Sequence, residues 1–174
     1  MHKLMRIAMP VVACAALAVL SAVPAQAATS GGTGTTFTIT GGALSITVPG
    51  SANLGSQPAG LTALTATGSL GDVTVSDLRG LLTTWTTTAQ STNFTSGSAS
   101  VPASSVNYVP GTPNIAGSLT FTQLPATGLD TPKTVATGAT IGASNASWNP
   151  TISVLLPVGT TVGTYTATIT HSVV

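Results

Sequence analysis

Charged side chains are scarce in this sequence, which has four Lys and Arg and three Asp and Glu among its 174 residues. A typical soluble domain carries charge on about 25% of its residues, against 4% here. Because nucleic-acid binding requires many cationic side chains to neutralise phosphates, the composition excludes nucleic acid as a partner. Solubility must rest on Thr, Ser, Asn and Gly, which suits a protein held in a wall or matrix.

Cysteine is almost absent, and the single one, Cys14, lies within the N-terminal apolar run. The rest of the chain can therefore form no disulfide and no cysteine-based metal site. His171 is the only histidine beyond that segment, and Asp72, Asp77 and Asp130 show no spacing typical of metal ligands. We expect no metal and no cofactor, so stability must come from an apolar core, for which the chain is long enough.

The N-terminus has the three parts of a secretory signal peptide. Two basic residues precede an apolar run over 7–23, and Ala25 and Ala27 occupy the small-residue positions of an Ala-x-Ala cleavage site. We expect residues 1–27 to be removed as a signal peptide. The exported chain is then extracellular, either secreted or associated with the cell wall.

Two alternatives to cleavage are less favoured. As a membrane anchor, the apolar run is interrupted by Pro10 and Ser21 and falls short of the ~20 residues that a comfortable span needs. As a lipoprotein signal, Val12-Ala13-Cys14 has most of the apolar run after the cysteine rather than before it. The mature form is therefore expected to have no membrane span.

Thr and Val dominate the remaining chain, and both favour β-strands. Short segments alternate polar and apolar residues with a period of two and are separated by Gly and Pro. The segments expected to form strands are 37–40, 44–48, 72–76, 85–89, 106–109, 118–122, 148–156 and 164–171, with a further hairpin near Phe94 and Val101. This spacing predicts an all-β fold, an antiparallel β-sandwich of the Ig-like, Greek-key type.

The exported chain is expected to be a single domain. Residues 28–41 are interpreted as a flexible N-terminal lead that includes the first strand, and residues 42–174 as the sandwich. Residues 124–143 contain two prolines and three glycines. We expect that stretch to be mostly loop.

Several short features follow one another in a recognisable order. They are 42–46 (Gly-Ala-Leu-Ser-Ile), Pro49, Leu54-Gly55, 73–80 (Val-Thr-Val-Ser-Asp-Leu-Arg-Gly), Trp85, Phe94 and 163–170 (Gly-Thr-Tyr-Thr-Ala-Thr-Ile-Thr). Their order resembles the WxL-domain family of Gram-positive cell-surface proteins over residues 42–174. The most specific part is the V-x-V-x-D-x-R-G segment with the tryptophan that follows it.

Both motifs that name this family are altered here. Trp85 is followed by Thr86-Thr87 without a leucine, and His171-Ser172-Val173 stands where the second tryptophan is expected. The resemblance implies export and non-covalent attachment to the peptidoglycan-containing wall, often beside other surface proteins, with no enzymatic activity. It also implies structural roles for Gly80 in a turn and for Tyr165 in the closing strand.

Trp85 and Trp148 are the only tryptophans. Each is interpreted first as a core residue, since a buried Trp contributes a large apolar area. The alternative is an exposed platform that stacks on the sugar rings of a glycan. Turn-forming residues surround Trp148, which makes it the better platform candidate of the two.

Asp77 and Arg79 stand two residues apart in a chain with few other charges. The first interpretation is a structural ion pair that fixes the geometry between a strand and a turn. The alternative is that Arg79 binds a carboxylate of a peptide stem through two parallel hydrogen bonds.

No catalytic constellation is recognisable. The G-x-S-x-G pattern of a nucleophile elbow does not occur, and His171 is expected to be a solvated residue near the chain end with no role. Glycan cleavage needs two carboxylates with different pKa values, and only three aspartates are available. The sequence predicts that the protein is not an enzyme.

Two functions follow from these features. The leading one is a secreted, cell-wall-associated binding module that attaches non-covalently to peptidoglycan or a wall glycan. The alternative is a structural subunit of a surface layer or surface complex that assembles through strand edges, because few charges protect those edges. A secreted carbohydrate-binding domain without a wall role is a third hypothesis.

Overall fold

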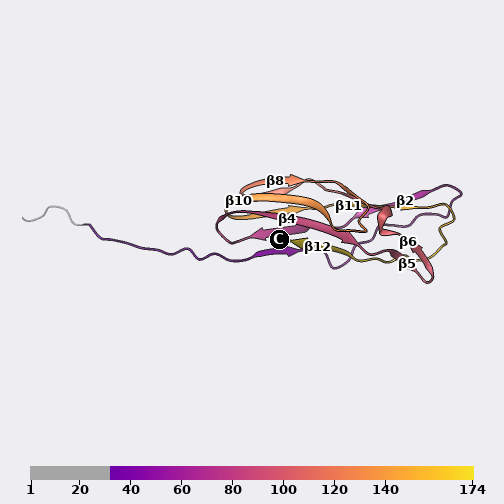
Figure 1. The fold of residues 1–174 in the computed structure, drawn as a ribbon, viewed down its shortest axis with the longest axis horizontal. Coiled ribbons are helices and arrows are strands. Elements are labelled where there is room, and N and C mark those ends of the chain that lie inside the picture. The colour runs from indigo at the N-terminus through magenta and orange to yellow at the C-terminus, as the bar shows by residue number, and fades with distance from the viewer. Residues whose placement is uncertain (1–31) are drawn as a thin grey trace, which may run out of the picture. The chain divides into compact units, whose positions relative to one another are not determined.

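A computed structural model describes residues 32–174 (Figure 1). The predicted signal peptide, with Ala25 and Ala27, lies outside these residues. The chain divides into two compact units, the first ending at Phe37 and the second covering Thr38–Val174. Residues 32–37 of the first unit form no helix or strand, and the description below concerns the second unit.

The second unit is all-β, with antiparallel sheets. One sheet has the order β1-β3-β10-β4-β12, with β8 also paired to β10, the other has the order β2-β11-β7-β9, and β5 and β6 form a hairpin. The strands are β1 (Leu44–Thr47), β2 (Leu64–Ser69), β3 (Val73–Asp77), β4 (Leu82–Ser91), β5 (Phe94–Ser96), β6 (Ala99–Val101), β7 (Val106–Val109), β8 (Asn114–Gln123), β9 (Ala126–Thr127), β10 (Lys133–Trp148), β11 (Thr151–Leu156) and β12 (Ile169–Val173), with one short 3-10 helix, η1 (Ala103–Ser105).

Strand β10 is the central strand of the larger sheet and pairs along both edges (Figure 1). Ala136 lies opposite Gln123 of β8 and Thr87 of β4, whereas Ala146 lies opposite Ile115 of β8 and Val75 of β3. One edge is therefore occupied by β8 throughout. The other edge is shared by β4 and β3, which follow one another along it.

The larger sheet bends back on itself where β3 passes into β4. Val75 and Trp85 belong to one buried cluster, although ten residues of straight strand would hold them about 33 Å apart. Register irregularities mark the bend, because the pairing of β10 with β8 shifts between Ile141 and Ser144. Gly117 has φ +84° there, and a side chain on it would collide with the carbonyl oxygen of Ala143.

The two halves of the bent sheet face each other across a continuous core. Trp85 comes from one half and Trp148 from the other, and the ring of Phe121 packs between them with centroid distances of 5.8 and 5.3 Å. The indole N–H of Trp148 donates to the hydroxyl of Tyr108 in the second sheet, at 2.8 Å. Gly138 lies opposite both Trp85 and Phe121.

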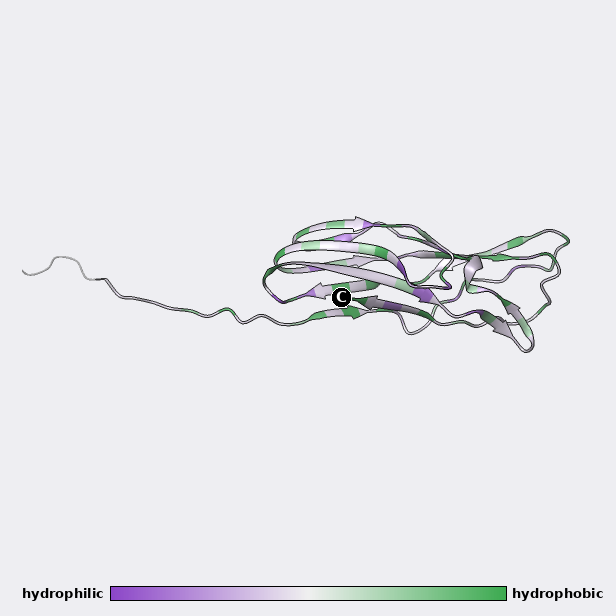
Figure 2. Cartoon of the chain, in the orientation of Figure 1, coloured by the Kyte–Doolittle hydropathy of each residue, from purple (hydrophilic) through white to green (hydrophobic). Residues whose placement is uncertain are grey.

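The second sheet extends the half that contains β3. Only Asn149 and Pro150 separate β10 from β11, and the amide of Leu70, between β2 and β3, donates to the carbonyl of Pro150 at 2.9 Å. Buried residues of β7 and β11 share a cluster with Ala89 of β4. Along the strands, the polar and apolar residues alternate with few strongly hydrophilic stretches (Figure 2).

Several predicted strands are confirmed, among them 44–48, 72–76, 85–89, 106–109 and 118–122 as parts of β1, β3, β4, β7 and β8. The predicted strand over 37–40 is wrong, because that segment has no neighbouring strand and Phe37 and Ile39 are 87% and 84% exposed. The closing segment pairs as a strand only from Ile169 onward.

The prediction of a loop over 124–143 is also wrong, because β10 begins at Lys133 and is the longest strand of the described chain. Its glycines do not break the strand. Gly138 is buried beneath Trp85, whose indole atoms would overlap any β-carbon added there. Strand β2 has no counterpart among the predicted strands.

His171 is not a solvated tail residue. It is 9% exposed within β12, and its Nε2 lies 3.4 Å from the hydroxyl of Tyr108. Burial lowers the pKa of His171 from its ordinary 6.5 to about 4. The same low-polarity surroundings raise the pKa of the Tyr108 phenol.

Replacing Gly138 with alanine should destabilise the domain. The added β-carbon would overlap the indole of Trp85, and overpacking of this kind costs about 1–3 kcal/mol. Denaturant unfolding measures the change. Ala139→Val, one residue further along on the exposed face, is the matched control and should change stability by less than about 0.5 kcal/mol.

Acid should destabilise the fold through His171. Because its folded pKa is about 4 and its unfolded value 6.5, the unfolded chain binds the proton first as pH falls. Stability is thus lost between pH 6.5 and 4, by ~3 kcal/mol in total. A plot of the free energy of unfolding against pH should be flatter across this window in His171→Leu than in the unmodified protein. An unchanged slope in that variant would contradict the assignment of this pH dependence to His171.

Candidate functional site

A cleft opens at the end of the domain that lies away from the bend at 78–81. It has a volume of about 800 Å³ and is lined by β2 and β11 of the second sheet, by Phe94 of β5 and by two long connections, residues 51–60 and 157–163. The strands of the larger, bent sheet contribute no side chain to the lining. The cleft therefore lies against the second sheet.

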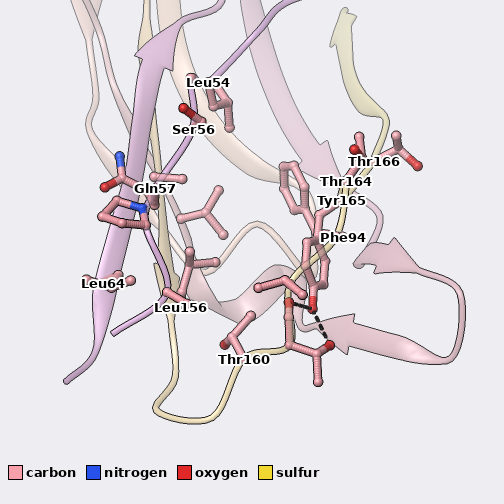
Figure 3. Close-up of a pocket in the computed structure, with 18 of the residues that line it drawn as sticks. Leu54, Ser56, Gln57, Leu64, Phe94, Leu156, Thr160, Thr164, Tyr165 and Thr166 are labelled. Carbon is pink, nitrogen blue, oxygen red and sulfur yellow. Dashed lines mark hydrogen bonds between the residues drawn. The ribbon is translucent and has the colours of Figure 1, made fainter. Parts of the chain in front are cut away.

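Aliphatic and aromatic side chains form opposite walls of this cleft. Leu64 of β2 and Leu156 of β11 lie on one wall, with Leu54 above them, whereas the rings of Phe94 and Tyr165 lie on the other (Figure 3). Hydroxyl and amide groups stand at the rim, from Ser56, Gln57, Thr160, Thr161, Thr164 and Thr166. Half-buried apolar walls with a polar rim are typical of a ligand site.

Gly68 determines how the first connection crosses β2. A β-carbon on Gly68 would lie 2.7 Å from the Cα of Leu54 and 2.8 Å from the carbonyl oxygen of Asn53. The side-chain oxygen of Asn53 also accepts from the amide of Gly55 at 2.8 Å. The absence of a side chain at position 68 thus lets the loop pack directly on the strand and positions Leu54 at the cleft.

Tyr165 fixes the second connection to the aromatic wall. Its hydroxyl donates to the carbonyl of Thr161 at 2.9 Å and lies 3.1 Å from the Thr161 hydroxyl (Figure 3). The turn is tightened by Thr160, whose amide and hydroxyl both donate to the carbonyl of Pro157. Thr95 and Thr166 exchange two backbone hydrogen bonds of 3.0 Å, which hold Phe94 beside Tyr165.

No charged side chain lines the cleft within the described chain. Such a site offers nothing to pair with an ionic ligand, whereas hydroxyl and amide groups can donate to and accept from neutral polar groups. The rings supply flat apolar faces. This combination fits a neutral ligand with one apolar face and several hydroxyl or amide groups.

Neither tryptophan reaches this cleft. Trp85 is 2% exposed and Trp148 is 1% exposed, both inside the core. The alternative of an exposed platform for sugar rings is therefore wrong in this conformation, because each ring face is covered by neighbouring side chains. Their packing agrees with the interpretation of both as core residues.

Asp77 and Arg79 lie at the closed end, away from the cleft. The guanidinium donates from Nε to Asp77 Oδ1 at 2.9 Å and from a terminal nitrogen to Oδ2 at 2.7 Å. These hydrogen bonds hold the pKa of Asp77 below its usual value and raise that of Arg79. Because the guanidinium of Arg79 already donates two parallel hydrogen bonds to Asp77, it is not free to bind a peptide carboxylate in the same way.

The two residues predicted to be structural by family resemblance are placed far apart. Gly80 has φ +72° in the turn after Arg79, a conformation that favours glycine. Tyr165 belongs to the cleft wall rather than to a regular strand.

Sequence reasoning missed Leu54, Leu64 and the cleft role of Phe94, although the long Gly- and Pro-containing stretch after β1 was a signal for a functional loop.

Comparisons with protein-family models, with curated proteins and with solved structures give no match to this chain. The resemblance to WxL domains therefore rests on the residues quoted above and stays a prediction. From residue 32 onward, no helix has the length and hydropathy to cross a membrane. The same residues contain no group of three or more potential metal ligands.

Tyr165→Phe should loosen the connection over 157–163 while keeping the aromatic ring. The variant loses the hydrogen bonds to Thr161, and one such bond contributes about 1 kcal/mol, or roughly a five-fold change in a local opening equilibrium. Amide hydrogen exchange should accelerate by that factor in this segment. Protection in β10 should stay unchanged, and a uniform acceleration would instead indicate global destabilisation.

Proposed function

We propose that this protein is an exported, non-catalytic binding module of a Gram-positive cell surface that attaches non-covalently to peptidoglycan or another wall glycan. The observation that carries the proposal is the uncharged cleft of about 800 Å³ with Phe94 and Tyr165 on one wall. The signal-peptide pattern and the resemblance over residues 42–174 support the location.

A glycan matches the chemistry of the cleft group by group. The C–H face of a sugar ring is apolar and packs on aromatic rings, while its hydroxyl and acetamido groups seek hydrogen-bond partners. Ser56, Gln57 and Thr164 stand at the rim where such groups would lie. A polymer of such sugars could lie along the open cleft without burying charge.

We further infer that the fold is an antiparallel β-sandwich. The two facing halves of the bent sheet, joined by β2, β7, β9 and β11, would be its layers. The Ig-like, Greek-key assignment and the domain boundary at residue 42 remain predictions. A non-enzymatic role fits a cleft whose described lining includes no ionisable side chain other than the phenol of Tyr165.

Binding should be measured by co-sedimentation of the exported chain, residues 28–174, with isolated Gram-positive peptidoglycan. We expect binding that persists at high salt, because screening weakens charge pairs but not contacts between neutral groups. Tyr165→Ala should weaken it about ten-fold, which corresponds to ~1.4 kcal/mol.

The control variant is Ile141→Ala, which removes an exposed apolar side chain at the closed end of the domain. It should bind as the unmodified protein does. Protein that stays in the supernatant at every salt concentration would refute wall binding. An equal loss of peptidoglycan binding in Tyr165→Ala and Ile141→Ala would show that the cleft is not the binding site.

The alternative function, a structural subunit that assembles through strand edges, gains support from a separate part of the molecule. Strand β8 pairs only with β10, so its outer edge has no partner in the described chain. Assembly and wall binding use different surfaces and can coexist.

A further inference from the structure

The free edge of β8 is an unprotected strand edge. Its ten residues, 114–123, include no charged residue and no proline, which are the features that usually block pairing with another chain. The backbone groups along this edge are available to a further strand. Unprotected edges of this kind recruit an added strand from a partner.

The inner face of β8 carries an apolar stripe that the fold covers only in part. Leu119 and Phe121 pack against the core cluster of Trp85 and Trp148 but remain partly exposed. Ser118, Thr120 and Thr122 point to the exposed face. A strand added beside β8 could place two apolar side chains, two residues apart, over Leu119 and Phe121.

The described chain contains one segment with this pattern and no strand partner. Residues 35–40, Thr-Thr-Phe-Thr-Ile-Thr, alternate with a period of two and have high β-propensity. Phe37 and Ile39 are 87% and 84% exposed. In an extended segment these two side chains point to the same face, as Leu119 and Phe121 do on β8.

We propose that residues 35–40 of one copy of this protein pair with the free edge of β8 in a second copy. Phe37 and Ile39 then cover Leu119 and Phe121, and the backbone extends the sheet by one strand. Thr38 lies beside Thr120 on the exposed face, whether the added strand runs parallel or antiparallel. Neither segment carries charge, so no desolvation of ions opposes the pairing.

The segment cannot reach β8 of its own chain. The amide of Gly42 is bonded to the carbonyl of Leu78, which anchors the segment beside β1, and β8 is three strands away in the order β1-β3-β10-β8. An added strand beyond β8 is about 19 Å from β1 at 4.8 Å per strand. Ile39 must also reach β8, and three extended residues, from Gly42 to Ile39, span at most about 11 Å, so the partner must be a second copy.

Disulfide trapping tests this arrangement, because residues 28–174 contain no cysteine. Exported chains carrying Thr38→Cys and Thr120→Cys are prepared separately, mixed and oxidised. The expected product is the mixed disulfide dimer. Thr38→Cys mixed with Thr65→Cys is the control, because Thr65 is exposed on β2, another edge strand of the domain.

Sedimentation velocity of the unmodified exported chain gives the second measurement. We expect concentration-dependent association that falls at least ten-fold in Phe37→Ser/Ile39→Ser and persists in Thr36→Ser/Thr38→Ser. The double variant should fold normally, because the segment lies outside the core.

Three outcomes would overturn the proposal: a monomer at every concentration, association unaffected by Phe37→Ser/Ile39→Ser, or equal trapping at Thr65→Cys and Thr120→Cys. The inference extends the structural-subunit alternative and does not rest on the cleft. Loss of glycan binding in Tyr165→Ala and loss of association in the segment variant are therefore independent results.

Discussion

The carboxylate of Asp77 is 1% exposed, at the point where β3 ends and the chain turns to begin β4. It receives the guanidinium of Arg79 on both oxygens, the amide of Arg79 at 3.1 Å and the hydroxyl of Thr83 at 3.2 Å. The same guanidinium donates to the carbonyl of Thr84. A buried carboxylate is tolerated only when its oxygens accept hydrogen bonds in this way. The turn brings the donors to Asp77, and the hydrogen bonds to Asp77 in return stabilise the turn. In a chain with three acidic residues, few other partners for Arg79 compete.

The bend explains why one end of the domain is closed. Where the sheet turns back, β8 and β10 run continuously from one half to the other, and their pairing shifts register at the bend. Large side chains from both halves fill the space between them, with Phe121 between Trp85 and Trp148. Towards the other end, Ala89 of β4 packs against buried residues of β7 and β11. The core there thins to partly buried side chains such as Phe94 and Leu156, and the cleft begins where they end. The ion pair thus stabilises the bend of the larger sheet, whereas the cleft is built on the second sheet and its connections.

Much of this fold could be predicted from the sequence, because period-two alternation and frequent Gly and Pro are local signals. The strands that are predicted correctly, such as β1, β3 and β8, carry clear alternation of Thr or Ser with Val, Leu, Ile or Phe. Strand β10 escapes prediction because its glycines look like breakers. Gly138 is required instead by a tertiary contact with Trp85, a residue of another strand, and no local rule reveals such a contact.

The cleft could not be predicted from the sequence, for a different reason. Its walls come from four separate parts of the chain, near Leu54, Leu64, Phe94 and Tyr165, and none carries a motif. The tryptophans are the obvious candidates because large aromatic residues often bind sugars, yet in a chain with 4% aromatic residues the two largest are needed to fill the core. The smaller rings, Phe94 and Tyr165, are left for the surface.

The scarcity of charge acts in opposite directions on the cleft and on the free edge of β8. In the cleft it leaves a lining without charged side chains, so the proposed binding would depend on shape and on neutral hydrogen bonds, which resist salt. Along β8 it removes the lysines and inward charges by which most β-proteins keep their edges apart. A protein free in a concentrated solution would aggregate through such an edge. If the protein is exported and immobilised on a surface, as proposed, it meets other copies in a limited set of orientations. The unprotected edge of β8 and the unpaired segment 35–40 of another copy would then be a means of ordered assembly.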